Sequence, residues 1–294
     1  MLYDYKSMSH INSSSNSSVY IIGEIGQNHN GSIHIAQSII DVVHSVNSQL
    51  QRFTGDSSII GFNSIKTTLR DLEYENTNSF NAKPYESVHS FGKTYLDHRK
   101  ALELSIDDHA IIAEYARSKD LDFVVTLCAP SCLNLLDKVT PAYLKVASRD
   151  LTNIPLIRAL ASTKIPMIIS TGMANIEDID SALEAITHYH SSVSILHCVS
   201  VYPPKINQTN LLSVPYLISH YGDNFSIGYS DHSIGVLLPS LAVALGASII
   251  EKHITLSRSL KGTDQSGSLE EVGMFKMVRD IRTTESSLLS LIHI

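Results

Sequence analysis

The chain has 294 residues, with 22 basic and 29 acidic residues and a net charge of −7. This length suits one large α/β barrel or two medium domains, and we expect one domain. The acidic balance argues against a general nucleic-acid binder. No run reaches the roughly 18 uncharged apolar residues of a spanning helix, and the first residues lack the order of a signal peptide, so we expect a soluble protein with no membrane partner.

The N-terminal residues and the cysteines give two further expectations. Residues 12–18 read NSSSNSS and have nothing to bury, which predicts a disordered polar tail over 1–17 and a folded domain over 18–294. Cys128, Cys132 and Cys198 show no paired spacing, and two of them lie in apolar runs. Buried free thiols of this kind are typical of a reducing, cytoplasmic setting.

From Val19 onward, short β-branched runs alternate with stretches of helical period, which is typical of βα units. Eight strand candidates can be counted, at 19–26, 61–68, 121–129, 142–150, 165–173, 193–203, 225–233 and 248–255. Helix candidates lie between and after them, at 32–46, 107–120, 154–163, 175–190, 235–247 and 268–289. We expect Asn30 or Ser32 to cap the first helix, with Gly31 allowing the turn.

Eight strands and eight helices predict an α/β fold, the (β/α)8 TIM barrel. A doubly wound sheet is the competing arrangement, and it needs a glycine-rich phosphate turn after the first strand. The segment EIGQNHNGS lacks the G-x-G-x-x-G spacing, so the barrel is favoured. In such a barrel the active site lies at the C-terminal ends of the strands, and polar residues at those ends are the candidates for function.

His232 and His253 end two consecutive strand candidates. Neighbouring strands lie about 4.8 Å apart, so two imidazoles at matching heights can hold one divalent metal with open positions for a substrate. Manganese, magnesium and cobalt suit such a site as well as zinc does. The alternative is that each histidine only packs against or caps its strand end.

Lys66 and Lys145 lie within β-rich runs, where a charge is costly without a partner, so each is a candidate to bind an anion. Five other strand ends carry hydroxyl groups, those of Thr126, Ser148, Ser170, Ser200 and Ser230. These hydroxyl groups can help the lysines to encircle a phosphate and a carboxylate, or each can form a local hydrogen bond with the backbone instead.

Three other positions have two interpretations each. Glu24 ends the first strand and can act as a general base or pair with Lys66. Asp264 lies in a loop after the eighth strand and can accept hydrogen bonds from sugar hydroxyls or form a turn. His98 and Arg99 fit a solvated helix start better than a ligand set.

Seven segments carry a resemblance to a known family: IIGEIGQNHNGS, YLKVASRDLTNIPLI, ISTGM, LHCVSVYPP, GYSDHS, ALGASIIEKHIT and GTDQSGSLE. Together they resemble the sialic acid synthases, which include N-acetylneuraminate, legionaminate and pseudaminate synthases, and the likeness covers roughly residues 19 to 285. The resemblance implies that phosphoenolpyruvate condenses with an open-chain N-acetylmannosamine-like aldose. The products are a nine-carbon 3-deoxy-2-keto sugar acid and phosphate.

The resemblance also implies roles for individual residues. A divalent cation, usually Mn²⁺, with Mg²⁺ or Co²⁺ as alternatives, would be held by His232 and His253. Phosphoenolpyruvate would be held by Lys66, Thr126, Lys145, Ser148, Ser200 and Ser230, and the amino sugar by Asp150, Tyr202 and Asp264. Glu24, Lys66 and Lys145 would be the catalytic residues.

Three departures from the family bear on the substrate. Relatives often read K-F-Q or K-H-Q where this chain has Lys66, Thr67 and Thr68, so a glutamine that contacts sugar is missing. Asp150 stands where many members carry glutamate. Family members usually continue into an antifreeze-like domain that lends an arginine to a partner's sugar site, and the sequence given stops at SLLSLIHI. We therefore expect weak turnover without a separate antifreeze-like domain protein, and a homodimer as in the family.

Three rival functions remain as alternatives. A related 3-deoxy-keto-acid synthase acting on arabinose or erythrose phosphate needs extra cations for a second phosphate, and Arg149 is the only further one among the strand-end residues. A metal-dependent hydrolase needs H-x-H on the first strand, which GEIGQNHNG lacks. A catalytically weakened sugar-acid-binding relative has no chemical reason to keep Glu24, two lysines and two histidines.

Overall fold

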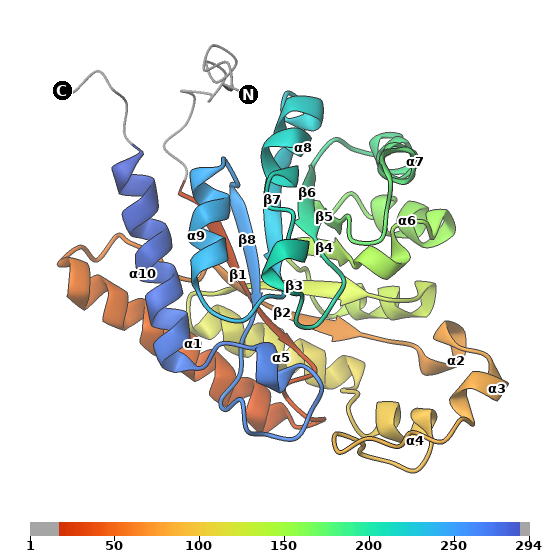
Figure 1. Ribbon diagram of the computed structural model, residues 1–294. Coiled ribbons are helices and arrows are strands. Elements are labelled where there is room, and N and C mark those ends of the chain that lie inside the picture. The colour runs from red at the N-terminus through yellow and green to blue at the C-terminus, as the bar shows by residue number, and fades with distance from the viewer. Residues whose placement is uncertain (1–17, 289–294) are drawn as a thin grey trace.

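The computed structural model describes residues 18–288. Its eight strands are parallel and close in chain order, with β8 paired to β1, so the predicted TIM barrel is confirmed (Figure 1). The tail predicted over 1–17 lies outside the described residues, as do residues 289–294. The strands are β1 (Tyr20–Gly26), β2 (Ser64–Leu69), β3 (Asp122–Leu127), β4 (Tyr143–Val146), β5 (Met167–Ser170), β6 (Val193–Cys198), β7 (Ser226–Asp231) and β8 (Ile249–His253).

Helices pack around the outside of the barrel, and α10 lies beside both α9 and α1 in Figure 1. The six predicted helices are all present, and the structure adds a further outer helix, α8, which the sequence pattern does not predict. The outer helices are α1 (Ile33–Thr54), α5 (Ile106–Ser118), α6 (Ile154–Ala161), α7 (Ile176–Thr187), α8 (Ser213–Tyr221), α9 (Leu237–Ala244) and α10 (Glu271–Ser287). None of the described helices is long and apolar enough to cross a membrane.

A helix follows each of the eight strands as predicted, and the third βα unit differs only in the type of its helix. A 3₁₀ helix, η2 (Pro130–Asp137), follows β3 instead of an α-helix. Its buried side chains, Cys132 and Leu135, lie three residues apart, as the three-residue turn of a 3₁₀ helix requires. The connection from Leu127 to Tyr143 is short, and this tight helix covers it.

The turn into α1 follows the predicted chemistry. The Ser32 side chain accepts a hydrogen bond from the Ile35 N–H, so Ser32 is the cap and Asn30 is not. Gly31 has a φ of 72°, and a Cβ there would collide with the Ala101 carbonyl oxygen. Only glycine fits this turn without strain.

Period-two alternation along the strands builds the floor of the site. Ile22, Ile168, Leu196 and Ile249 form a buried apolar cluster inside the barrel. Side chains two residues further along a strand lie on the same face. The next inward layer is therefore polar or thiol-bearing, and consists of Glu24, Ser170, Cys198 and Glu251.

A long segment between β2 and α5 carries three short helices, α2 (Leu72–Glu75), α3 (Asn78–Asn81) and α4 (Tyr95–Lys100), which project from the barrel in Figure 1. His98 and Arg99 are 3% and 5% exposed, so the expectation of a solvated helix start is wrong. The Tyr85 ring stacks on His98 with centroids 4.3 Å apart. Packing between residues distant along the chain buries them, and helical period alone does not reveal it.

Candidate active site

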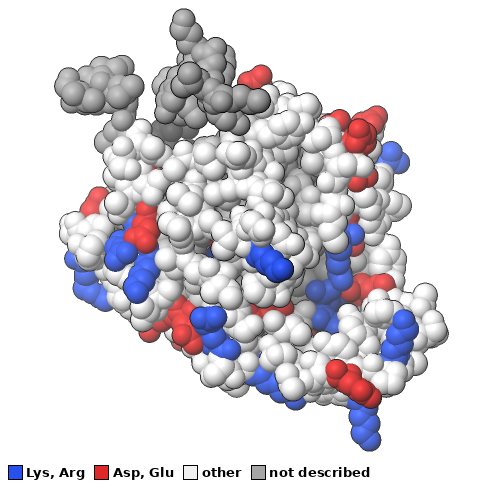
Figure 2. Space-filling view, viewed as in Figure 1, with Lys and Arg blue, Asp and Glu red and all other residues white. Residues whose placement is uncertain are grey.

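A cavity of about 360 Å³ opens at the C-terminal ends of the strands. Figure 2 shows a hollow on this face with basic and acidic side chains at its edge. Asp150 does not line the cavity and is held beside it, where Arg149 Nε lies 3.2 Å from its carboxylate. The other predicted site residues all line it, namely Glu24, Lys66, Thr126, Lys145, Ser148, Ser200, Tyr202, Ser230, His232, His253 and Asp264.

Two lysines and two carboxylates form the buried centre of this cavity. Lys66 Nζ lies 2.5 Å from Glu24 Oε2 and 3.6 Å from Glu251 Oε2. Lys145 Nζ lies 3.4 Å from Glu251 Oε1. All four side chains are more than nine-tenths buried. Glu24 therefore does pair with Lys66, one of the two interpretations that the sequence allows, and Glu251 bridges the two lysines.

The two carboxyl groups respond to burial in opposite directions. Burial raises the pKa of Glu24 to about 7, although Lys66 opposes the shift. Burial also opposes ionisation of Glu251, but Lys145 and Lys66 outweigh it and hold the pKa of Glu251 below its usual range. Glu24 is therefore the carboxyl group of this centre that can take up or release a proton near neutral pH.

Hydroxyl groups surround the lysines. Lys66 Nζ donates to Thr126 Oγ1 at 3.4 Å, and Ser230 Oγ donates to Glu251 Oε1 at 2.8 Å. Gly172 packs tightly against two further hydroxyls, because a Cβ there would collide with the Oγ atoms of Ser148 and Ser200. Its N–H donates to Ser148 Oγ at 3.1 Å.

His232 and His253 converge as the sequence predicts, with ring centroids 5.8 Å apart. His232 Nδ1 lies 2.8 Å from the Val199 carbonyl oxygen, which can only accept, so the proton is on Nδ1 and the Nε2 lone pair is available. His253 Nδ1 is buried and has no hydrogen-bond partner among the described residues. The Tyr202 ring stacks on the His232 ring, with the ring centroids 4.0 Å apart. The two imidazoles thus fit a metal ion with open positions, and residues 18–288 offer no group of three or more His, Cys, Asp or Glu for a closed site.

A buried ion pair supports the histidines from behind. Lys252 Nζ lies 2.6 Å from Asp231 Oδ2, and both side chains are fully buried. Asp231 also accepts from the Tyr229 hydroxyl at 3.0 Å and from the Ser233 N–H at 2.9 Å. Asp231 and Lys252 alternate with the inward-facing Ser230, Glu251 and His253, so they tie β7 to β8 without entering the large cavity.

The loop that carries Asp264 is docked onto the loop after β1. Asn28 Nδ2 donates to Ser268 Oγ at 2.8 Å, and Ser268 Oγ donates to the Asp264 carbonyl oxygen at 2.7 Å. Gln265 Nε2 donates to the Asn28 carbonyl oxygen at 3.2 Å. Asp264 is therefore held at the cavity, beside the loop after β1.

Sequence reasoning missed two features of the lining. Glu251 stands at a strand end but received no role. Arg70 also lines the cavity, so the expectation that Arg149 is the only further cation is wrong. The signal was present, because Arg70 lies on the same alternating positions as Lys66 and Thr68. Cys128, Cys132 and Cys198 are free and buried, as expected.

Comparison with known proteins agrees with this geometry. The family model described as "NeuB family" matches residues 57–292. The chain is 32% identical to the N,N'-diacetyllegionaminic acid synthase of Legionella pneumophila, over 92% of this chain and 73% of that protein. It is 32% identical to the N-acetylneuraminate-9-phosphate synthase of Mus musculus, over 92% and 71%. The crystal structure of N-acetylneuraminic acid synthetase from Leptospira borgpetersenii in complex with citrate superposes with a TM-score of 0.80 at 31% identity, over 95% of this chain and 88% of that chain. The chain therefore belongs to the NeuB family of sialic acid-type synthases, which are enzymes that form carbon–carbon bonds.

Proposed function

We propose that this enzyme condenses phosphoenolpyruvate with an open-chain N-acetylmannosamine-like aldose to give a nine-carbon 3-deoxy-2-keto acid and phosphate. The observation that carries the proposal is one cavity faced by two buried lysines and two converging imidazoles. The synthase names of the relatives, which include N-acetylneuraminate-9-phosphate and diacetyllegionaminic acid, agree with it.

Lys66 and Lys145 are the groups suited to the anionic substrate. Phosphoenolpyruvate carries a carboxylate and a phosphate, and two ammonium groups at the bottom of a buried cavity give it charge compensation that water does not match. The hydroxyls of Thr126, Ser148, Ser200 and Ser230 face the same space and add hydrogen bonds. In this role they fix the reactive methylene carbon relative to the acceptor.

A divalent cation, Mn²⁺ by expectation and Mg²⁺ or Co²⁺ as alternatives, would be held by His232 and His253 and would supply Lewis-acid polarisation of a carbonyl oxygen. The available Nε2 lone pair of His232 and the unpartnered Nδ1 of His253 support this assignment. The buried pair of Asp231 and Lys252 keeps the spacing of the imidazoles.

In the proposed reaction, the methylene carbon of phosphoenolpyruvate bonds to the aldehyde carbon, and the aldehyde oxygen gains a proton. A water oxygen then bonds to C2 and gives up one proton. The bond from C2 to the phosphate oxygen breaks as the C2 hydroxyl becomes the keto group, and its proton leaves with the phosphate. Glu24 lies against Lys66 and has a pKa of about 7, so at neutral pH it can receive the proton of that water or give one to the new hydroxyl.

We assign Tyr202 and Asp264, which line the cavity, to the acceptor, together with Asp150, which lies beside the cavity next to Arg149. Thr68 faces the same cavity in place of the glutamine expected in relatives. Its shorter side chain leaves more room, so the acceptor need not be N-acetylmannosamine itself. Homodimerisation and supply of an antifreeze-like domain by a separate protein remain predictions.

The test is phosphate release from phosphoenolpyruvate with Mn²⁺ and a panel of aldoses, with and without an added antifreeze-like domain. We expect release with an N-acetylated amino sugar, and a Lys145→Met variant to lower kcat/KM for phosphoenolpyruvate by at least about tenfold. Lys138→Met, at a half-exposed surface lysine, is the matched control. Release only with arabinose 5-phosphate or erythrose 4-phosphate would instead support the related sugar-phosphate synthase, and release with no aldose would refute the proposal.

A further inference from the structure

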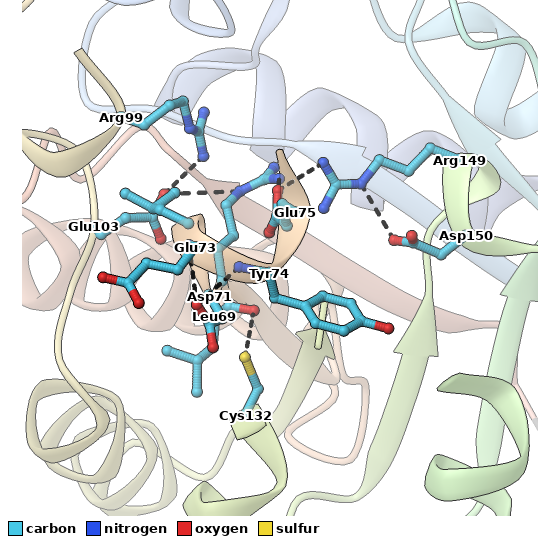
Figure 3. Close-up of polar contacts among 12 residues, drawn as sticks. Leu69, Asp71, Glu73, Tyr74, Glu75, Arg99, Glu103, Cys132, Arg149 and Asp150 are labelled. Carbon is cyan, nitrogen blue, oxygen red and sulfur yellow. Dashed lines mark hydrogen bonds and ion pairs between the residues drawn. The ribbon is translucent and has the colours of Figure 1, made fainter. Parts of the chain in front are cut away.

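Figure 3 shows a chain of alternating charges, two of which, Arg70 and Arg149, line the cavity. Arg149 Nη1 and Arg70 Nη1 each lie 3.1 Å from the same oxygen of Glu75, Oε2. Arg70 Nε lies 3.7 Å from Glu103 Oε1, which is also 2.7 Å from Arg99 Nη2. With Asp150 at the far end beside Arg149, three cations alternate with three carboxylates.

Arg70 and Arg149 form a second layer of positive charge above the lysines. Arg70 directly follows the strand that carries Lys66, Arg149 lies in the short 3₁₀ helix η3 (Ser148–Asp150) after the strand that carries Lys145, and both arginines line the cavity. The side chains of Lys66 and Lys145 are 6% and 4% exposed, whereas those of Arg70 and Arg149 are 15% and 39% exposed. The lysines are therefore at the bottom of the cavity and the arginines at its mouth.

Glu75 occupies the point on which the two guanidinium groups converge. Its side chain is 8% exposed, yet its second oxygen, Oε1, is buried without a hydrogen-bond partner among the described residues. Two guanidinium groups offer several N–H donors in planar pairs, which match a phosphate or carboxylate with several accepting oxygens. One carboxylate oxygen shared between them uses only part of this capacity.

Release of Glu75 from this point leaves no arginine isolated. Arg70 keeps Glu103 as a neighbour and Arg149 keeps Asp150. Glu75 lies on α2, a four-residue helix without a buried residue, in the segment that projects from the barrel. A carboxylate on such a helix can reach water when another anion takes its place. A purely structural tether, in contrast, would not need two cations that face the substrate cavity.

We propose that Arg70 and Arg149 form a second anion subsite, that it binds an oxyanion on the end of the acceptor remote from the aldehyde, and that Glu75 is its internal competitor. The inference rests on the proposed function and deepens it, because it assigns the acceptor to the class of aldoses with a terminal phosphate monoester. Phosphoenolpyruvate is held at the lysine layer, so the mouth of the cavity is left for the far end of the acceptor.

The experiment compares N-acetylmannosamine 6-phosphate with N-acetylmannosamine as acceptors for the wild-type chain, Arg149→Gln, Glu75→Gln and Arg158→Gln. Arg158 is an exposed arginine of α6 and serves as the control. The readout is selectivity, defined as kcat/KM for the phosphorylated sugar divided by kcat/KM for the neutral one. We expect the wild type to prefer the phosphorylated sugar, and Arg149→Gln to lower the selectivity by about tenfold or more.

Glu75→Gln is the decisive variant, because it is expected to raise selectivity several-fold, which misfolding does not do. Arg158→Gln should leave the selectivity unchanged. A wild type that prefers the neutral sugar, or an Arg149→Gln variant with the selectivity of the wild type, overturns the inference. If no aldose releases phosphate, the proposed function fails, and calorimetric binding of N-acetylmannosamine 6-phosphate decides the subsite separately. In that case, an equal affinity of the wild type and Arg149→Gln for this sugar phosphate overturns the subsite. A lower affinity in Arg149→Gln and a higher affinity in Glu75→Gln support the subsite.

Discussion

Gly172→Ala is expected to damage the phosphoenolpyruvate site without changing any charged or hydroxyl group. The φ of Gly172 is not in the left-handed region, so the backbone itself accepts alanine. The added Cβ would collide with the Oγ atoms of Ser148 and Ser200 and approach the Cys198 carbonyl oxygen at 3.3 Å. Both hydroxyls must therefore rotate or shift away from the cavity.

The magnitude follows from the hydrogen bonds lost. A hydroxyl that donates to a charged oxygen contributes about 1.5 kcal/mol, so loss of two corresponds to about 3 kcal/mol, or roughly a 100-fold higher Kd for phosphoenolpyruvate. Overpacking at this position should lower the free energy of unfolding by about 1–3 kcal/mol. Ser200→Ala removes one hydroxyl without a collision and should weaken binding only about tenfold.

The assay is calorimetric titration of the sugar-free protein with phosphoenolpyruvate, with circular dichroism to confirm the fold. Gly267→Ala is the control, because a Cβ there meets nothing within 4 Å. A folded Gly172→Ala protein that binds phosphoenolpyruvate as tightly as the wild type would refute the reasoning that these two hydroxyls hold the anion.

Three further predictions concern the buried charges and the imidazoles. Lys252→Met leaves Asp231 buried without its partner and should lower the free energy of unfolding by about 3 kcal/mol or more in denaturant titrations, and adding Asp231→Asn should restore part of the loss. His253→Ala should abolish Mn²⁺ binding to the metal-stripped protein in calorimetry, whereas His220→Gln, at an exposed histidine, should leave it unchanged; equal binding in both variants would contradict the metal assignment. Because burial raises the pKa of Glu24 from 4.5 to about 7, the folded state retains a proton that the unfolded chain has lost in that window, so stability falls as pH rises through it. Glu24→Gln has no such proton to lose. Its free energy of unfolding, measured relative to that of the wild type, should therefore rise between pH 5 and pH 8 by about 3 kcal/mol at most. If this difference in free energy of unfolding does not change with pH, the raised pKa is contradicted.

The sequence by itself determined the barrel and most of the candidate site. Alternation of β-branched runs with helical periods is a local signal, and it located all eight strands. A parallel barrel brings the C-terminal ends of its strands to one face, so residues as distant as Glu24 and His253 could be assigned to one cavity before any coordinates were known.

The tertiary structure decided what those residues contact. From the sequence, Glu24 could be either a free general base or the ion-pair partner of Lys66. The distance of 2.5 Å between Glu24 Oε2 and Lys66 Nζ shows that the two residues are paired. The sequence pattern gave no reason to place Glu251 between two lysines, and it indicated a solvated position for the buried His98. The physical reason is that period and composition act over neighbouring residues, whereas burial, ion pairing and pKa depend on distances between segments that only the closed barrel brings together.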